Sequence, residues 1–309
     1  MDGDELAWIA KATGATSARR ADRIQSLWSG YGEIVRVRLT GARGAAERED
    51  HTVIVKSVKP PARARGKSAA KADDASHARK CRSYDVEMAW YRSFASRCDA
   101  ACRVPQFLGG RSEGGEWLFV LEDLDNTHAG FPERRRRCTS AELGVCLGWL
   151  AAFHARFLGV APEGLWKTGT YWHLATRTEE LAAIEDPELR AAAPILDRQL
   201  REATFKTLVH GDAKLANFCF APGGRAVAAV DFQYVGGGAG VKDVAYLLYG
   251  ESSSAAVEQR HLDTYFTHLR EDVAKLHPAI DLAALESEWR ALYPIAAADF
   301  RRFLAGWRG

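Results

Sequence analysis

Two neighbouring stretches decide how this sequence folds: VHGDAKLANFCF, residues 209–220, and AAVDFQY, residues 228–234. Each contains a short apolar run that is typical of a buried strand, and Pro222-Gly223-Gly224 between them predicts a turn. We therefore expect the two runs to pair as a hairpin. Such a hairpin would bring Asn217 and Asp231 to neighbouring ends of its strands.

The polar residues of these stretches are of the types that handle phosphate. Two hard oxygen ligands, from Asn217 and Asp231, with the carboxylate of Asp212 beside them, suit Mg²⁺ that carries a phosphate. Zinc would want histidine or thiolate ligands. The spacing also matches a kinase catalytic loop, in which Asp212 would accept the proton of the attacking hydroxyl while the other two bind metal. Each residue alone could instead cap a turn, but the spacing as a whole indicates phosphoryl transfer.

Two further residues of the same loop have expected roles. Lys214, two residues after Asp212, is placed to offset negative charge that develops on a transferring phosphoryl group. His210 is expected to brace the loop by hydrogen bonding, in a supporting role.

Upstream of these stretches, the sequence predicts a part rich in β-strands. Residues 34–39 alternate with period two and residues 51–58 form a second strand, so we expect a hairpin. Lys56 lies in the second strand among apolar neighbours, and Glu87 lies on the polar edge of an expected helix over 83–97. Alone, the lysine could be an edge-strand charge and the glutamate a surface charge. Together they reproduce the lysine–glutamate ion pair of the kinase template.

Backbone groups of this part are candidates for nucleotide contacts. Gly30 and Gly32 could let backbone amides approach a phosphate, or they could form only a hairpin turn. A buried strand over 117–121 leads into an expected hinge. There, Glu122 would offer its carbonyl and Leu124 its N–H to adenine.

Other N-terminal segments also have predicted structures. Helical spacing predicts helices over 4–12 and 18–28, and Pro105–Gly110 predicts a turn. Residues 62–80 are basic and poor in large apolar groups. We expect them to form a solvated loop or a basic lid over an anionic ligand.

The C-terminal half predicts helices. The strongest pattern covers 140–158, with Ser140 as its cap. Within it, His154 is expected to be a hydrogen-bonded core histidine. Residues 178–205, interrupted by two prolines, and most of 242–309 are also expected to be helical.

Length and composition limit the class of protein. The chain has 309 residues, 47% of them hydrophobic and 27% charged, which is ordinary for a globular protein of one large or two packed domains. We expect an α+β fold of two lobes, a small β-rich lobe over 1–121 and a larger, mainly helical lobe over 122–309. A net charge of +2 excludes nucleic-acid binding through bulk charge. No apolar run is long enough for a membrane span, and six scattered cysteines without a secretory pattern predict a reduced, cytoplasmic chain.

The stretches 209–220 and 228–234 together resemble phosphotransferases of the protein-kinase-like fold. This group holds aminoglycoside phosphotransferases, choline and ethanolamine kinases and the ecdysteroid-kinase-like (CHK-type) proteins. The likeness extends from about Gly30 to Leu248, and it implies a bilobal protein-kinase-like fold with ATP and Mg²⁺ as cofactors. Residue by residue, it implies the same roles as the spacing: Asp212 as base, Asn217 and Asp231 as Mg²⁺ ligands, Lys56 and Glu87 as the ion pair, and 121–124 as the hinge.

Details of the motif favour one branch and one kind of acceptor. Choline kinases tend to read DFE where this chain has Asp231-Phe232-Gln233, which resembles the ecdysteroid-kinase-like branch. Asp243, in VKDVAYLL, matches an Asp that opens the next helix in the family, where we expect a helix cap. The short segment between the two aspartates contains the glycine-rich stretch 236–240, which we expect to be a flexible turn. Because this leaves little room for a peptide platform, we expect a small-molecule alcohol as the acceptor.

Residues near the second metal ligand are candidates for the acceptor site. They are Tyr234 and the aromatic cluster of Trp166, Tyr171 and Trp172. The same rings could equally belong to the core. The run Arg134–Arg137 could hold an anionic substrate or be a solvated face.

The sequence therefore predicts an ATP- and Mg²⁺-dependent phosphotransferase that phosphorylates a hydroxyl group of a small molecule. The alternative is a catalytically silent nucleotide-binding or scaffold protein with the same fold, although a silent protein usually loses at least one catalytic position. A metal-dependent phosphoesterase that uses His210 and the aspartates is less favoured, because no second histidine lies at ligand spacing. The sequence names neither the acceptor nor an oligomeric state.

Overall fold

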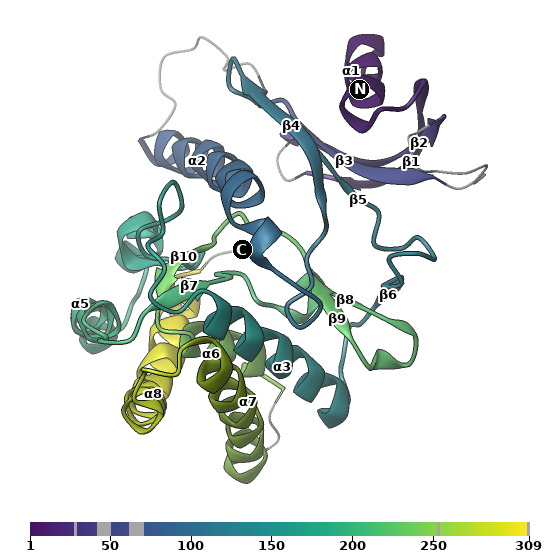
Figure 1. Ribbon diagram of the computed structural model, residues 1–309. Coiled ribbons are helices and arrows are strands. Elements are labelled where there is room, and N and C mark those ends of the chain that lie inside the picture. Colours follow the sequence, from purple (N-terminus) through teal and green to yellow (C-terminus); the bar gives the residue numbers. More distant parts are fainter. Residues whose placement is uncertain (28–29, 42–50, 62–70, 252–253, 308–309) are drawn as a thin grey trace. The chain divides into compact units, whose positions relative to one another are not determined.

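The structure is a computed structural model that divides into two compact units (Figure 1). One consists of Met1–Ser96 and Val104–Glu133, and the other of Arg97–Arg103 and Arg134–Gly309. The first unit thus extends to Glu133, twelve residues beyond the boundary expected at residue 121. The short segment Arg97–Arg103 comes before that boundary in the chain but belongs to the second unit. The structure describes residues 1–27, 30–41, 51–61, 71–251 and 254–307, and of residues 71–74 only the backbone.

The first unit is built on a five-stranded antiparallel sheet in the order β1-β2-β3-β5-β4. One helix precedes the sheet in the chain, and a long helix connects β3 to β4. Its elements in chain order are α1 (Gly3–Thr13), β1 (Ser17–Ser26), β2 (Gly32–Thr40), β3 (Thr52–Val58), α2 (Lys71–Ser93), the 3-10 turn η2 (Ala95–Arg97), β4 (Phe107–Glu113) and β5 (Glu116–Glu122).

Alternating apolar residues of β2 and β3 form a hydrophobic core on one face of this sheet. Val35 and Val37 of β2 and Val53 and Val55 of β3 are buried, and the residues between them are partly exposed. Ile9 of α1 packs against the same face. Because Val35 lies opposite Val55 in an antiparallel pair, the hairpin expected for these two segments is confirmed.

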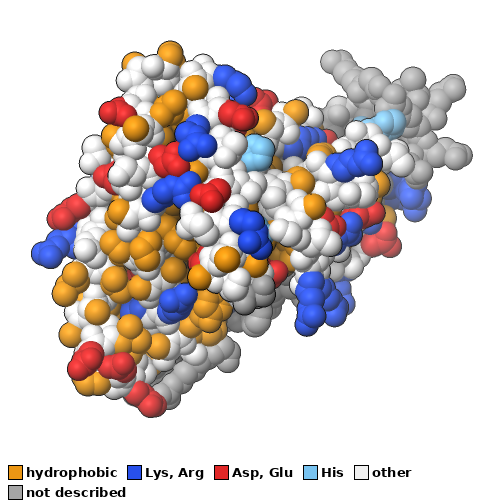
Figure 2. Space-filling view, turned by 90° about the horizontal axis from the view of Figure 1, so that it is seen from below, with side chains coloured by type: hydrophobic (Ala, Val, Ile, Leu, Met, Phe, Trp, Pro, Cys, Tyr) orange, Lys and Arg blue, Asp and Glu red, His pale blue; other side chains and the backbone are white. Residues whose placement is uncertain are grey.

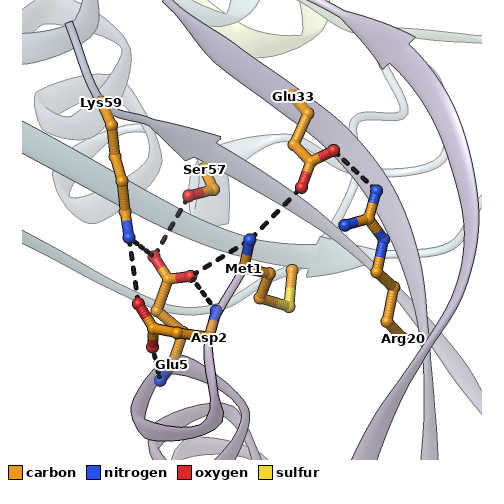
Figure 3. A network of polar contacts seen from close by, with 7 residues as sticks. All are labelled: Met1, Asp2, Glu5, Arg20, Glu33, Ser57 and Lys59. Carbon is orange, nitrogen blue, oxygen red and sulfur yellow. Dashed lines mark hydrogen bonds and ion pairs between the residues drawn. The ribbon is translucent and has the colours of Figure 1, made fainter. Parts of the chain in front are cut away.

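A polar network fastens α1 to the sheet (Figure 3). Glu5 is only 2% exposed. Its carboxylate accepts a hydrogen bond from Ser57 Oγ at 3.2 Å and lies 3.1 Å from Lys59 Nζ. Asp2 caps the helix in a capping box with Glu5. Since a buried carboxylate is costly unless it is paired, this network holds the helix at one place on the sheet.

The helix predicted over 18–28 is wrong, because this segment is strand β1 at the edge of the sheet. Its apolar residues do recur with helical spacing, but of its described residues, 18–27, only Leu27 is buried. Pairing with β2, from Ser17 opposite Thr40 to Ser26 opposite Glu33, satisfies its backbone instead. Long-range pairing therefore overrides the local pattern.

The segment over 62–80 differs from the expected loop or lid. Residues 62–70 lie outside the described part, and helix α2 already begins at Lys71 rather than at residue 83. The first turns of α2 are rich in alanine, lysine and arginine, which are strong helix formers. Low hydrophobicity there is therefore compatible with a helix as well as with a loop.

The turn predicted at Pro105–Gly110 is also replaced by regular structure. Strand β4 begins at Phe107 and pairs with β5, with a register shift between Phe107 and Gly109. The glycines interrupt the apolar alternation that would have indicated a strand.

The second unit is mainly helical, with short strands between the helices. Strand β6 (Glu133–Arg134) stands at the boundary of the units. The other elements are α3 (Ser140–Arg156), η3 (Leu174–Thr176), α4 (Thr178–Ala182), α5 (Pro187–Arg201), β7 (Thr207–Val209), η4 (Leu215–Asn217), β8 (Phe218–Phe220), η5 (Pro222–Gly224), β9 (Val227–Ala229), β10 (Gly236–Gly238), α6 (Val241–Leu248), α7 (Ala255–Leu276) and α8 (Leu282–Gly306).

Helix starts in this unit follow ordinary capping chemistry. The cap of α3 is Thr139, not Ser140 as expected, and it forms a capping box with Glu142. Pro187 does not interrupt a helix but begins α5, where its missing N–H costs nothing.

The glycine-rich stretch expected to be a flexible turn is instead strand β10, which pairs with β7. A Cβ at Gly236 would lie 2.2 Å from the carbonyl oxygen of Trp166. The glycines are therefore required by close backbone packing rather than by flexibility.

The surface shows both signs of charge. Figure 2 shows Lys and Arg side chains interspersed with Asp and Glu on the face drawn, as a net charge of +2 leads one to expect. Among the described residues, no helix combines the length and the apolar content needed to cross a membrane.

Candidate active site

The first unit contains the expected ion pair. Lys56 Nζ on β3 lies 2.6 Å from Glu87 Oε2 on α2. The two residues are 5% and 2% exposed. The rings of Tyr84 and Phe119 lie 5.5 and 5.9 Å from the ammonium. A lysine held in this way has a fixed direction, like the paired lysine of the kinase template.

The backbone groups of this unit that we expect to contact a nucleotide do not form a site that geometry alone identifies. Gly32 has a φ of +141°, and a Cβ there would lie 2.0 Å from the carbonyl oxygen of Ser57, so packing on β3 alone explains this glycine. Gly30 has a φ of +73° with open space around it. At the expected hinge, Glu122 N–H donates to Gln106 O, and Leu124 is buried. Contacts of these groups with a nucleotide stay predictions.

In the second unit, Asp212 follows β7 and is 5% exposed. Its Oδ2 accepts hydrogen bonds from Lys214 Nζ at 2.9 Å and Asn217 Nδ2 at 3.0 Å. Burial raises the pKa of Asp212 to about 6, an effect that Lys214 opposes and the charge of Asp231 reinforces. The carboxylate thus has the raised pKa that suits a general base near neutral pH.

The hairpin that brings Asn217 and Asp231 together is confirmed. Phe218 pairs with Ala229, and Val230 N–H donates to the carbonyl of Asn217 at 3.0 Å. Asp231 has a φ of +69°, a left-handed conformation that Asp tolerates better than most residues.

This donor set fits a magnesium ion. The Nδ2 of Asn217 is tied to the backbone and side chain of Asp212. Its carbonyl oxygen, a hard ligand, is therefore on the other edge of the amide. Among the described residues no group of three or more His, Cys, Asp or Glu could hold a metal. Mg²⁺ typically takes one or two protein carboxylates and completes its shell with phosphate and water, so the oxygens of Asn217 and Asp231 are of the type that it binds.

His210 is a support inside the loop. It is fully buried; its Nε2 lies 3.0 Å from Val230 O, and its Nδ1 accepts from Asp212 N–H at 3.2 Å. Burial lowers its pKa, so the ring is neutral. Because both ring nitrogens are engaged, His210 does not offer a free metal ligand, which argues against the phosphoesterase.

The role expected for Asp243 is wrong. The cap of α6 is Gly240, and Asp243 lies within the first turn and reaches back to the loop. Its carboxylate accepts from His210 N–H at 2.6 Å and from Gly211 N–H at 2.9 Å. The signal was present in the sequence: a lone aspartate among the apolar residues of VKDVAYLL had to find buried partners.

The interpretation of His154 as a hydrogen-bonded core histidine is confirmed. It is fully buried between Tyr265 Oη, at 2.8 Å from its Nδ1, and Asp243 Oδ2, at 3.2 Å from its Nε2. Helices α3 and α7 are thereby linked to the loop that carries Asp212.

The candidate acceptor residues separate into two kinds. Tyr234 and Trp166 are half-buried and stack with ring centroids 6.2 Å apart. Trp172 is 1% exposed and packs in a core cluster with Phe300 and Phe303. Sequence reasoning missed Tyr246, whose hydroxyl lies 3.3 Å from Asp212 Oδ1. Its place among the apolar residues of α6 gave no hint of this contact.

In the run Arg134–Arg137, Arg135 donates to Glu142 Oε1 at 2.9 Å. Its guanidinium also lies over the ring of Phe220. The other three arginines are exposed. This arrangement favours a solvated face over an anion site.

Comparison with known proteins identifies the family. The sequence matches the model of the phosphotransferase enzyme family (APH) over residues 53–291, more than half of the chain, and the chain belongs to this family. A search of curated proteins found no match.

Among solved structures, the fold is similar to that of amicoumacin kinase hAmiN, solved with AMP-PNP, Ca²⁺ and Ami, with a TM-score of 0.56 and 13% identity over 99% of this chain and 85% of that one. Type VIII aminoglycoside-3'-phosphotransferase gives a TM-score of 0.44 at 16% identity over 90% and 93% of the two chains. Choline kinase LicA from Streptococcus pneumoniae gives 0.45 at 13% over 97% and 95%. The expected α+β, protein-kinase-like fold class is thus confirmed.

Proposed function

We propose that this protein transfers the γ-phosphoryl group of ATP to a hydroxyl group of a small molecule. The observation that carries the proposal is the arrangement at Asp212. One of its carboxylate oxygens accepts hydrogen bonds from Lys214 and Asn217. The carboxylate of Asp243 accepts hydrogen bonds from the two backbone N–H groups that precede Asp212. Membership of the phosphotransferase family supports the reaction class.

In the proposed reaction, the acceptor hydroxyl gives its proton to Asp212 as its oxygen attacks the γ-phosphorus. The bond from that phosphorus to the β–γ bridging oxygen breaks, and ADP leaves with the electron pair. The proton on Asp212 is later released to water. Lys214, 46% exposed at its side chain, would offset charge on the transferring group. His210 would hold the loop in register.

Two further groups would bind the nucleotide. Asn217 and Asp231 would hold Mg²⁺, which when bound neutralises charge on the phosphates. Lys56, oriented by Glu87, would bind the phosphates that are not transferred. A cytoplasmic location and membership of the ecdysteroid-kinase-like branch stay predictions. The six cysteines, all free in the structure, support the first, and Gln233 after Asp231-Phe232 supports the second.

The variant Asp212→Asn tests the proposal directly. Loss of the base should lower kcat about 10²- to 10⁴-fold and leave the Kd for ATP nearly unchanged, because a base acts in the transition state. Coupled ADP release across a panel of alcohols measures the first quantity, and calorimetry the second.

The control is Asp263→Asn, which changes a half-exposed carboxylate on α7. It should keep wild-type turnover. Undiminished acceptor-dependent turnover by Asp212→Asn would remove that residue from the role. ATP binding with only slow hydrolysis, insensitive to the substitution, would instead support a silent nucleotide-binding protein.

A further inference from the structure

The two oxygens of Asp212 have different neighbours. Oδ2 accepts from both Lys214 and Asn217, whereas Oδ1 accepts from the hydroxyl of Tyr246 at 3.3 Å. A hydroxyl that gives its proton to Asp212 must approach the less occupied oxygen. It would therefore lie beside the phenol of Tyr246 or take that phenol's place.

Tyr246 belongs to a row of four half-buried rings, which we call the aromatic row, and it also packs against the buried ring of Trp172, with ring centroids 4.9 Å apart. Tyr171 lies 5.6 Å from Tyr246, Tyr234 lies 6.0 Å from Tyr171, and Trp166 lies 6.2 Å from Tyr234, all between ring centroids. The first two pairs meet at steep angles of 61° and 64°, and the last is stacked at 9°. These are favourable arrangements for aromatic pairs.

The backbone holds the aromatic row in place beside the loop of Asp212. Tyr171 N–H donates to Gly211 O at 3.0 Å, and Thr170 N–H donates to Tyr234 O at 3.2 Å. Trp166 Nε1 donates to Gln233 O at 2.8 Å.

The contact between the row and the loop is also close. A Cβ at Gly211 would lie 2.1 Å from Tyr234 O, so only glycine allows this approach. These contacts fix the place of the row, which lowers the ordering cost of binding.

The charges around the row are not those that a polycation needs. The charged groups that act on Tyr171 include Asp212, Lys214 and Arg177, whose guanidinium lies 5.7 Å from the centroid of the Tyr171 ring. The carboxylate of Asp212 is already shared with Lys214, and the buried guanidinium of Arg177 pairs with Glu180 at 3.0 Å. An acceptor with several ammonium groups would meet these two cations beside Tyr171.

We infer that the acceptor is an alcohol carried on a planar, conjugated ring system, uncharged or anionic, whose ring lies against Tyr171 and Tyr234 of the aromatic row. This inference rests on the proposed function, because it places the reacting hydroxyl at Asp212 Oδ1. A flat ring gains contact area with the row at low conformational cost, and an anionic substituent would be drawn to Lys214.

Binding of three probes to the full chain without ATP tests the inference. The probes are 2-naphthylmethanol, its saturated analogue decahydro-2-naphthylmethanol, and the diaminocyclitol 2-deoxystreptamine. Calorimetry should give the naphthyl alcohol the lowest Kd of the three. Tyr171→Leu should raise that Kd about two- to tenfold, since an aromatic pair contributes about 0.5–1.5 kcal/mol. Tyr171→Phe keeps the ring and should restore it.

The matched control is Tyr249→Leu, which removes a half-exposed ring just after α6 and outside the row. It should leave the Kd of the naphthyl alcohol unchanged. If Tyr171→Leu does not fold, Tyr234→Leu replaces it. Tighter binding of the diaminocyclitol, undetectable binding of the naphthyl alcohol, or an unchanged Kd in the leucine variants overturns the inference. Failure of the proposed function is seen separately, as no ADP release with any acceptor.

Discussion

Each unit of this protein contains a lysine paired with a carboxylate, and the two pairs are built differently. In the first unit, Lys56 and Glu87 lie 2.6 Å apart and both are almost fully buried. In the second, Lys214 and Asp212 lie 2.9 Å apart, but the lysine side chain is 46% exposed. The distances are similar, and the environments are not.

The difference follows from the elements that carry the pairs. Lys56 projects from a central strand and Glu87 from a long helix. If either side chain moved away, the charge of the other would stay buried without this ion pair, which is costly. Lys214 lies just before a 3-10 turn and its side chain is 46% exposed, so its ammonium can exchange Asp212 for water. In the proposed function, a pair that only orients a charge can be fixed, whereas the carboxylate that would receive a proton needs a partner that can move.

The largest expected effect is on the pair of Lys56 and Glu87. Glu87→Ala should lower the free energy of unfolding by about 3–5 kcal/mol, because it leaves a buried ammonium without its partner. Urea denaturation measures this loss. A loss below about 1 kcal/mol, the range of exposed pairs, would mean that the two pairs are equivalent after all.

A double variant separates stability from activity in the same pair. Lys56→Met with Glu87→Leu should recover much of the stability lost in Glu87→Ala, because two apolar residues of similar volume need no partner. Turnover should stay low, since the phosphate-binding lysine is gone. If the double variant remains as unstable as Glu87→Ala, packing rather than charge explains the loss.

A third pair extends the comparison to a case in which burial outweighs the partner. Burial, with help from Lys242, lowers the pKa of His173 to about 4, although Asp197 lies 3.4 Å away. The unfolded chain then binds more protons than the folded one between about pH 6.5 and pH 4, so stability should fall as the pH is lowered through this range. The difference corresponds to at most about 3 kcal/mol.

The measurement is the free energy of unfolding at pH 7 and pH 4.5 for the wild type and His173→Gln. The variant cannot take up the proton, so its curve should be flatter over this range. Equal slopes would show that other groups cause the acid sensitivity.

The second unit also contains a buried network, formed by Tyr265, His154 and Asp243, whose disruption should lower the free energy of unfolding. His154→Phe leaves the buried hydroxyl of Tyr265 without its hydrogen-bond partner and should cost about 1–3 kcal/mol. Adding Tyr265→Phe should cost less than the sum of the two single variants, in a cycle measured by denaturation. Additive losses would contradict a direct coupling of the two side chains.

The smallest expected effect on stability is at the movable lysine. Lys214→Met should change the free energy of unfolding by less than about 1 kcal/mol, as exposed pairs do. Turnover should nevertheless fall about 10²-fold, the cost of removing one donor that stabilises developing charge. A large loss of stability with turnover intact would show that Lys214 has a structural role like that expected of Lys56, and would contradict the difference between the two pairs.

Much of the site is local in the sequence and could be predicted from it. Asp212, Asn217 and Asp231 lie within two loops joined by one hairpin, so strand and turn signals were enough to place the last two side by side. The pair of Lys56 and Glu87 needed only the order strand, then helix. Tyr246 and Asp243 could not be placed in this way, since the turn of α6 that faces the loop depends on packing.

The sequence by itself determined the fold class, the order of the elements around the hairpin and the residue types that handle phosphate, because short apolar runs, turn residues and motif spacing are local properties. Tertiary structure alone decided that Ser17–Ser26 is an edge strand, that β10 needs glycine, and that the hydroxyl of Tyr246 meets Asp212. These outcomes depend on backbone pairing and close packing between segments far apart in the chain, which no local pattern records.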